Sequence, residues 1–124
     1  MNQKNNQPAA PRTGRKTGSE VLVQSAAAYI ETRYRERFSL QAMAGELFVN
    51  GSYLLRVFKK QTGFTPLAYH NHIRCEHAKE LLRSTEDSIS DIGEAVGFVS
   101  SAHFSHVFRR MENCTPSEYR AGKE

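Results

Sequence analysis

The chain has 124 residues, of which 39% are hydrophobic and 24% are charged, and its net charge at pH 7 is +4. This length suits one globular domain, or two very small ones that share a core, and it excludes most catalytic folds. No apolar run approaches the roughly 18 residues of a membrane span, and the start of the chain lacks the apolar centre of a secretory signal. We therefore expect a cytosolic protein.

The positive charge is unevenly distributed. Residues 1–18 carry four basic side chains and no acid, whereas the other 13 Lys and Arg equal the 13 Asp and Glu in number. Residues 51–63 and 99–111 are basic without any acid, and acidic residues crowd between positions 76 and 94. This pattern indicates a dipolar molecule rather than a uniformly basic one.

Residues 1–18 are rich in Asn, Gln, Pro and Gly and have little that a core could bury. This composition predicts a disordered basic tail or an interdomain linker. A DNA-reading arm is the alternative, because the segment is basic.

The two cysteines, Cys75 and Cys114, are too few for a disulfide framework and lack the C-x-x-C spacing of a zinc site. We interpret both as free thiols, and we expect no metal and no cofactor.

Helix signals follow one another along the chain after residue 18. The residues placed to cap a helix are Ser19, Ser39, Asn50, Thr65, Ser88, Ser100 and Thr115. Those placed to end one in a left-handed conformation are Gly63, Gly97 and Asn113. No stretch alternates long enough for a strand, so the predicted fold is all-α with about seven helices.

The predicted core consists of apolar residues at helical spacing. In the first helix these are Leu22, Ala26, Tyr29, Ile30 and Tyr34, and in the helix that begins after Asn50 they are Leu54, Val57 and Phe58, with Gln61 on the same inward face. We expect His70, His72 and His77 on the surface of the long helix over about 65–84.

One phrase occurs twice in the sequence. "VFKKQTGFTPLAY" at 57–69 returns fifty residues later as "VFRRMENCTPSEY" at 107–119. Each copy includes the end of a predicted helix-turn-helix unit, and the two units cover about 39–63 and 88–113. In both copies a Thr-Pro pair follows the unit and begins a further helix. Ala44 and Gly93 are small residues in the first helix of each unit. The two helices of a helix-turn-helix cross at a steep angle and nearly touch, so a small residue is needed there. Two units are too few for a solenoid.

The sequence resembles the DNA-binding domain of the AraC/XylS family of bacterial transcription regulators. The matching text is "SLQAMAGELFVNGSYLLRVFKKQTGFTPLAYHNHIRCEHAKELLRST" followed by "SISDIGEAVGFVSSAHFSHVFRRMENCTPSEYR", and the resemblance covers about residues 19–120 of an ordered domain expected over 19–124. The most specific matches are Arg74, Ala78, Leu81 and Leu82, then Ile92 with "VGF" at 96–98, "HFSHVFRR" and "TPSEYR". Departures are Asn113 for a glycine, Cys75 for a larger aliphatic residue and Gly93 for an alanine.

The resemblance implies two three-helix subdomains joined by a long central helix over about 65–84, with a last short helix over about 115–121. The second helix of each unit would then enter one of two successive major grooves about 34 Å apart. A monomer would thus recognise an asymmetric, direct site on double-stranded DNA.

Residues near the start of each of these helices should face the bases, because the helix enters the groove by its N-terminus. The predicted base contacts are Ser52, Leu55 and Arg56 in the first unit, and Ser101, Ala102, His103 and His106 in the second. Arg56 could pair with guanine, Leu55 could touch a thymine methyl, and the histidines could donate to guanine.

Two of these residues have alternative interpretations. Arg56 could instead form a salt bridge with an acid such as Glu46. His103 and His106 could hold a metal, although no third ligand lies at suitable spacing.

Other basic residues and two helix starts are placed to bind phosphates without reading sequence. The predicted phosphate contacts are Lys59, Lys60, Thr65, Arg109, Arg110 and Thr115.

The sequence therefore predicts a transcription regulator in the bacterial cytoplasm, associated with the nucleoid. The family favours an activator that contacts RNA polymerase. A non-catalytic adaptor that binds protein through the acidic stretch is the alternative, and an enzyme is the weakest option because no catalytic constellation is evident.

Residues 1–18 resemble the linker that follows a sensor or dimerisation domain in many family members. We therefore expect the terminal domain of a longer regulator rather than a short free-standing member. By itself this domain should be monomeric, and any dimerisation would depend on the missing N-terminal part.

Overall fold

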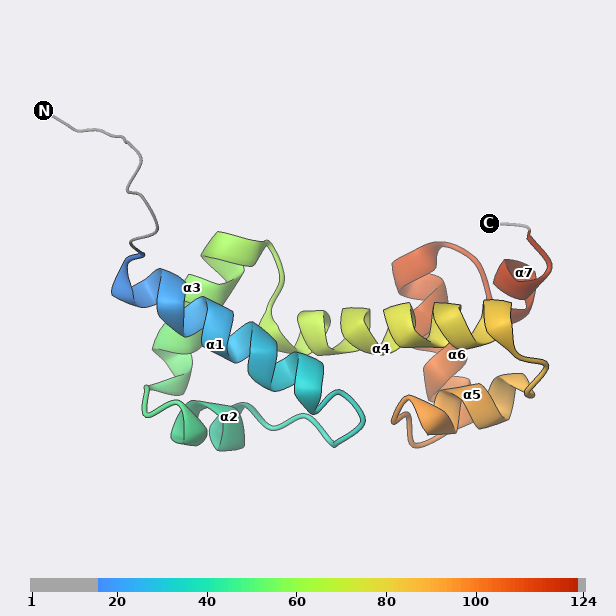
Figure 1. Ribbon diagram of the computed structural model, residues 1–124, viewed down its shortest axis with the longest axis horizontal. Coiled ribbons are helices and arrows are strands. Elements are labelled where there is room, and N and C mark those ends of the chain that lie inside the picture. Colours follow the sequence, from blue (N-terminus) through green and yellow to red (C-terminus); the bar gives the residue numbers. More distant parts are fainter. Residues whose placement is uncertain (1–15, 123–124) are drawn as a thin grey trace, which may run out of the picture.

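Seven α-helices and no strand make up residues 16–122, the part of the chain that the structure, a computed structural model, describes (Figure 1). The helices are α1 (Gly18–Thr32), α2 (Leu40–Glu46), α3 (Gly51–Thr62), α4 (Pro66–Ser84), α5 (Ile89–Ala95), α6 (Ser101–Glu112) and α7 (Pro116–Arg120). The all-α prediction is thus confirmed. The predicted basic tail lies outside the described residues, apart from residues 16–18.

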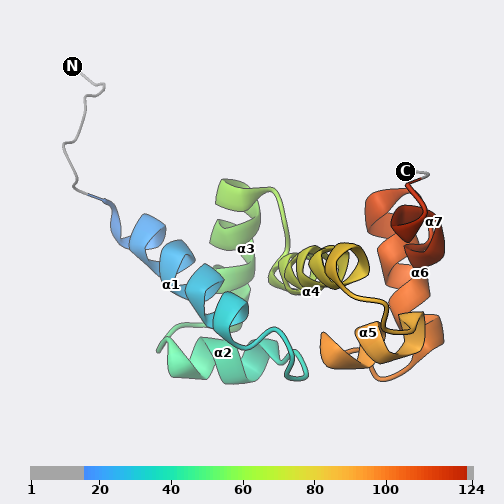
Figure 2. The ribbon, with the colours of Figure 1, turned by 45° about the vertical axis from the view of Figure 1, so that its right-hand side comes forward.

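The long helix α4 connects two bundles. Helices α1, α2 and α3 gather around its first half, and α5, α6 and α7 gather around its second half (Figures 1 and 2). This arrangement confirms the predicted pair of three-helix subdomains joined by a central helix. Among residues 16–122, no helix is both long and apolar enough to cross a membrane.

Each helix begins at a polar cap, and six of the seven predicted caps are correct. The exception is α1, which Thr17 caps instead of Ser19. The Thr17 hydroxyl accepts from the Glu20 N–H at 3.1 Å, and the Glu20 carboxylate accepts from the Thr17 N–H at 2.9 Å. This reciprocal pair requires a T-x-x-E spacing, which Ser19 cannot provide.

The predicted left-handed helix ends are also present. Gly63 (φ 82°) ends α3 and Asn113 (φ 64°) ends α6, while Gly97 (φ 107°) lies in the turn after α5. These residues direct the chain sharply away from each helix axis.

Each subdomain has a core of its own. The first contains Val23, Ala26, Ile30, Met43, Ala44, Leu54 and Phe58. The second contains Tyr34, Cys75, Ala78, Leu82, Ile92, Val96, Phe98, Phe104, Val107, Phe108 and Cys114, and both cysteines are buried. Ile73 on α4 packs against both cores. Gln61 is not inward as predicted, because its amide nitrogen donates to the Ser19 hydroxyl at the surface at 3.1 Å.

The predicted close crossing of the two helices in the second unit is confirmed. A Cβ atom added to Gly93 would lie 2.7 Å from a ring carbon of Phe104, closer than carbon atoms can approach. Gly93 thus lets α5 lie directly on α6.

His70 is a correction to the prediction that the histidines of α4 are surface residues. Its side chain is 3% exposed, and Nε2 lies 3.1 Å from the Glu36 carbonyl oxygen. Burial, together with the nearby Arg74 charge, lowers the pKa of His70 to about 4. His77, by contrast, is exposed and stacks on Tyr34 with ring centroids 4.0 Å apart.

Candidate nucleic-acid interface

Helices α3 and α6 have the same amphipathic construction. Leu54 and Phe58 bury one face of α3, and Phe104, Val107 and Phe108 bury the matching face of α6. The opposite faces carry polar and basic side chains that no part of the described chain covers. Each helix therefore presents a solvent-facing surface while its other side fixes it to the subdomain.

The two helices run in the same direction. In Figure 2, α3 and α6 stand on either side of α4, and both rise from the level of α2 and α5 towards the top of the view. Their N-terminal ends thus lie at the same edge of the molecule. This geometry is what two helices need to approach one straight DNA duplex together.

All seven predicted base-contact residues are exposed. On α3 they are Ser52, Leu55 and Arg56, and on α6 they are Ser101, Ala102, His103 and His106. The structure brings each set together on one helix, within its first two turns. Leu55 is 38% exposed and belongs to neither core.

Arg56 forms no ion pair with Glu46 or with any other acid of residues 16–122. Its guanidinium instead lies 5.1 Å from the centre of the Tyr53 ring on the preceding turn. Contact with the ring restricts the side chain while its N–H donors stay available to a partner.

The second helix offers imidazoles at the places where the first has Tyr53 and Arg56. His103 packs edge-on against Phe98 with ring centroids 5.3 Å apart, and His106 is exposed one turn later. No cluster of three or more metal-ligating side chains occurs in the described part of the chain, so these histidines have no third ligand there.

Basic side chains occupy the last turn of both helices. Lys59 and Lys60 on α3 correspond to Arg109 and Arg110 on α6, and all four are exposed. The Lys59 ammonium donates to the Gly63 carbonyl oxygen at 3.1 Å. These cations interact favourably with the negative C-terminal end of the dipole of their own helix. They also add positive charge beside the polar face of each helix.

The two predicted phosphate-binding helix starts differ. At α4, the Thr65 hydroxyl accepts from the Ala68 N–H at 3.1 Å. At α7, the Thr115 N–H already donates to the Glu118 carboxylate at 2.9 Å. A phosphate at Thr115 would have to displace this carboxylate and tolerate its charge, so Thr65 is the better placed of the two.

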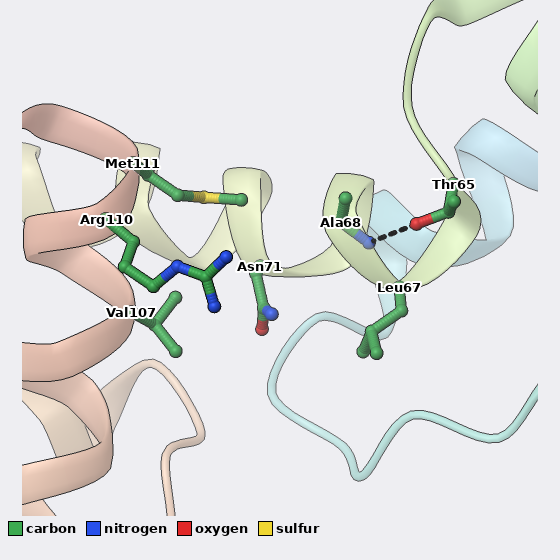
Figure 3. A pocket seen from close by; sticks show the side chains of 7 residues that line it. All are labelled: Thr65, Leu67, Ala68, Asn71, Val107, Arg110 and Met111. Carbon is green, nitrogen blue, oxygen red and sulfur yellow. Dashed lines mark hydrogen bonds between the residues drawn. The ribbon is translucent and has the colours of Figure 1, made fainter.

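A cleft of about 330 Å³ separates α6 from the first half of α4 (Figure 3). Its lining residues are Thr65, Leu67, Ala68, Asn71, Val107, Arg110 and Met111. In Figure 3 the Arg110 guanidinium extends from α6 towards Asn71 on α4. A second hollow of about 520 Å³ shares Leu67 and Asn71, and Arg37, Arg74 and His103 add further basic groups to it. Neither lining includes an acidic residue.

The acids gather elsewhere and are partly neutralised. Lys79 lies 2.8 Å from Glu76 and 3.1 Å from Glu112, and Arg83 lies 3.0 Å from Glu80. These pairs occupy the second half of α4, away from the N-terminal ends of α3 and α6.

A family model described as a helix-turn-helix domain matches residues 43–122. A crystal structure of an AraC-type DNA-binding regulator from Chromobacterium violaceum superposes with a TM-score of 0.78 and 35% identity, over 87% of this chain and 96% of that one. The chain belongs to the AraC-type helix-turn-helix family. The resemblance inferred from the repeat is thereby confirmed.

Other AraC-type proteins extend the comparison. The transcriptional activator RhaS of Escherichia coli is 37% identical over 97 residues, which are 78% of this chain and 35% of RhaS. YisR of Bacillus subtilis, described as an uncharacterized HTH-type transcriptional regulator, is 33% identical over 104 residues, which are 84% of this chain and 36% of YisR. The chain thus spans about a third of the length of these relatives.

The DNA-binding domain of AdpA was solved in complex with a target DNA. It superposes with a TM-score of 0.74 and 25% identity over 81% of this chain and 90% of the AdpA chain. The present chain therefore shares its fold with a DNA-binding domain that was solved with a target DNA.

Sequence reasoning missed several residues of this AraC-type domain. Arg37 and Asn71 line the hollow beside α6, and Arg74 and His70 hold the loop between α1 and α2. In the sequence, Arg74 stands out only as a match to the family. Its role depends on partners nearly forty residues away, which helical periodicity cannot identify.

Proposed function

We propose that this domain binds double-stranded DNA in a sequence-specific manner, with α3 and α6 in successive major grooves. One observation carries the proposal: two duplicated helices start at the same edge of the molecule with their polar faces exposed. The AdpA complex supports the DNA partner.

In this proposal Ser52, Leu55 and Arg56 read one block of bases, and Ser101, Ala102, His103 and His106 read the other. Arg56 provides the strongest single contact, because a guanidinium can donate two hydrogen bonds to guanine. Phosphates are held by Lys59, Lys60, Thr65, Arg109, Arg110 and Thr115.

Selection of bound duplexes from a random pool tests the proposal. The unmodified protein is expected to enrich two short conserved blocks one helical turn apart. Arg56→Ala should relax one block, and His106→Ala, at the equivalent position, should relax the other, each by roughly 1–3 kcal/mol of base discrimination. A protein-binding adaptor would enrich nothing that competitor DNA cannot displace.

The salt dependence of binding tests the phosphate contacts separately. Phosphates neutralised by the four cations among these contacts predict a slope of about −4 for the logarithm of the binding constant against the logarithm of salt concentration. Lys60→Ala and Arg110→Ala should each reduce the slope by about one without altering the selected sequence. A slope near zero would contradict the proposal.

We further propose that the whole protein regulates transcription and activates it by contact with RNA polymerase. The named activator RhaS among its relatives supports this direction. Transcription of a promoter carrying the selected site, with and without the protein, would reveal the sign. Repression at every position of the site would rule out activation.

A further inference from the structure

A loop of the first subdomain reaches into the second. We call residues 33–38, between α1 and α2, the clamp loop. Its Tyr34 is 7% exposed and belongs to the core of the second subdomain, although α1, which precedes it, belongs to the first. The clamp loop is thus a second connection between the subdomains, besides α4 (Figure 1).

The middle of α4 holds the clamp loop by its carbonyl groups. The Arg74 guanidinium donates to the Tyr34 carbonyl oxygen at 2.6 Å and to the Glu36 carbonyl oxygen at 2.8 Å. It also lies 5.0 Å from the centre of the Phe98 ring in the second subdomain. Arg74 is 6% exposed, so these charge-assisted bonds are shielded from water and are costly to break.

The turn between α5 and α6 meets the other side of the clamp loop. Arg35 Nε donates to the Ala95 carbonyl oxygen at 3.2 Å. A Cβ atom on Gly97 would lie 2.6 Å from the Arg35 carbonyl oxygen and 2.9 Å from its Cα. The backbones of the two subdomains touch here, and only a glycine allows it.

The equivalent turn of the first subdomain carries a residue with a side chain. Phe48 occupies the place of Gly97, and its N–H donates to Gly45 as that of Gly97 donates to Glu94. Phe48 also has positive φ (59°), yet it carries a large side chain that is 93% exposed. Gly97 differs from Phe48 in its larger φ of 107° and in its contact with the clamp loop.

We infer that the clamp loop fixes the distance and angle between α3 and α6, and so determines which spacing between two DNA half-sites this protein accepts. The inference rests on the proposed function. One added base pair moves a half-site by about 3.4 Å and turns it by about 35° around the duplex. Arg35, Arg74 and Gly97 are positioning residues in this scheme, since they join the two subdomains and are not among the proposed DNA contacts.

The test measures binding of the full chain to duplexes that carry the two selected blocks with the spacer shortened or lengthened by one or two base pairs. For the unmodified protein, each added or removed base pair should weaken binding roughly tenfold. Arg35→Ala and Gly97→Ala should reduce that penalty to about threefold or move the preferred spacing.

Two matched controls accompany these variants. Arg33→Ala removes the same charge from the same loop, but Arg33 stacks on Tyr29 of its own subdomain at 4.2 Å. Gly63→Ala strains another positive φ, yet its added Cβ would meet nothing within 4 Å. Both should keep the spacing profile of the unmodified protein. Circular dichroism verifies that each variant is folded.

Each outcome has a definite consequence. A flattened or shifted profile in Arg35→Ala alone already supports the inference, even if Gly97→Ala fails to fold. An unchanged profile in a folded Arg35→Ala, or equal flattening in the controls, would overturn it and leave the proposed function standing. If the unmodified protein selects no sequence, the proposed function fails and the inference falls with it.

Discussion

The two helix-turn-helix units have the same architecture but fill it differently. Where α2 and α3 cross, the first unit has Ala44 and Leu54, and the second has Gly93 and Phe104 at the equivalent places. The smaller residue accompanies the larger one, and all four are buried. The two crossings thus hold a similar total side-chain volume, although their residues differ.

A similar exchange occurs where the helix that follows each unit meets the chain segment that precedes the unit. Tyr69 donates its hydroxyl proton to Glu31, whereas the equivalent Tyr119 accepts from Arg83. His70 bonds the Glu36 carbonyl oxygen, whereas the equivalent Arg120 donates to the carbonyl oxygens of Leu82 and Thr85. The Glu36 carbonyl oxygen is thus bonded by His70 together with Arg74, whereas Arg120 alone bonds those of Leu82 and Thr85.

The largest expected effect on stability comes from replacing Gly93 of the second unit with alanine, the residue that the first unit has at the equivalent position. Gly93→Ala would place a methyl group within 2.9 Å of three atoms of Phe104, so α5 and α6 must separate. We expect the free energy of unfolding to fall by about 3 kcal/mol, measured by urea denaturation.

Adding Phe104→Leu recreates the pair found in the first unit and should recover at least half of that loss. Gly45→Ala is the control, because its added Cβ would meet nothing within 4 Å and should cost no stability. A double variant no more stable than Gly93→Ala alone would refute the idea of conserved volume.

The second-largest expected effect is a pH dependence of stability that comes from His70, whose equivalent in the second half is Arg120. The pKa of His70 is about 4 in the folded protein against the usual 6.5, so below pH 6.5 the unfolded chain binds a proton that the folded chain excludes. The free energy of unfolding should therefore decrease as the pH is lowered from 6.5 to 4, and the loss should be about 2 kcal/mol at pH 5.

His70→Gln keeps an N–H donor for the Glu36 carbonyl oxygen and does not titrate. Its free energy of unfolding should lose about 2 kcal/mol less than that of the unmodified protein between pH 7 and pH 5. Equal losses in the two proteins would mean that His70 is not the group responsible.

A third effect concerns the two turns. Phe48 holds a positive φ with nothing packed on its ring, whereas the second unit has Gly97 there. Phe48→Gly should therefore stabilise the protein by about 1 kcal/mol, because it removes backbone strain without losing buried area. Thermal denaturation measures this effect. A loss of stability would indicate that the Phe48 ring packs on something in solution.

These comparisons also show which features the sequence could predict. Caps and left-handed ends depend on residues within one helical turn, so Asn50, Gly63 and Thr65 could be assigned from the residue types alone. The repeat predicted the crossing at Gly93. The spacing of apolar residues along α3 and α6 predicted that the opposite faces of these helices are polar and exposed.

Other features depend on residues far apart in the sequence. Arg35 and Ala95 are 60 residues apart, and His70 and Glu36 are 34 apart. Periodicity predicted that Tyr34 is buried but could not indicate that it joins the second core. The repeat does contain one indication of such a contact, because Phe48 of the first turn aligns with Gly97 of the second. The glycine lies where the second turn contacts the clamp loop.

The smallest expected effect concerns the ends of α3 and α6. Gly63 and Asn113 occupy equivalent left-handed positions, with φ of 82° and 64°, and both N–H groups donate to the carbonyl four residues earlier. Asn tolerates this conformation better than other residues with a side chain, but glycine adopts it without steric cost. Asn113→Gly should raise the free energy of unfolding by about 0.5 kcal/mol, and Gly63→Asn should lower it by a similar amount. Urea denaturation of both variants would show opposite shifts. Shifts of the same sign would mean that the two helix ends are not equivalent in their surroundings.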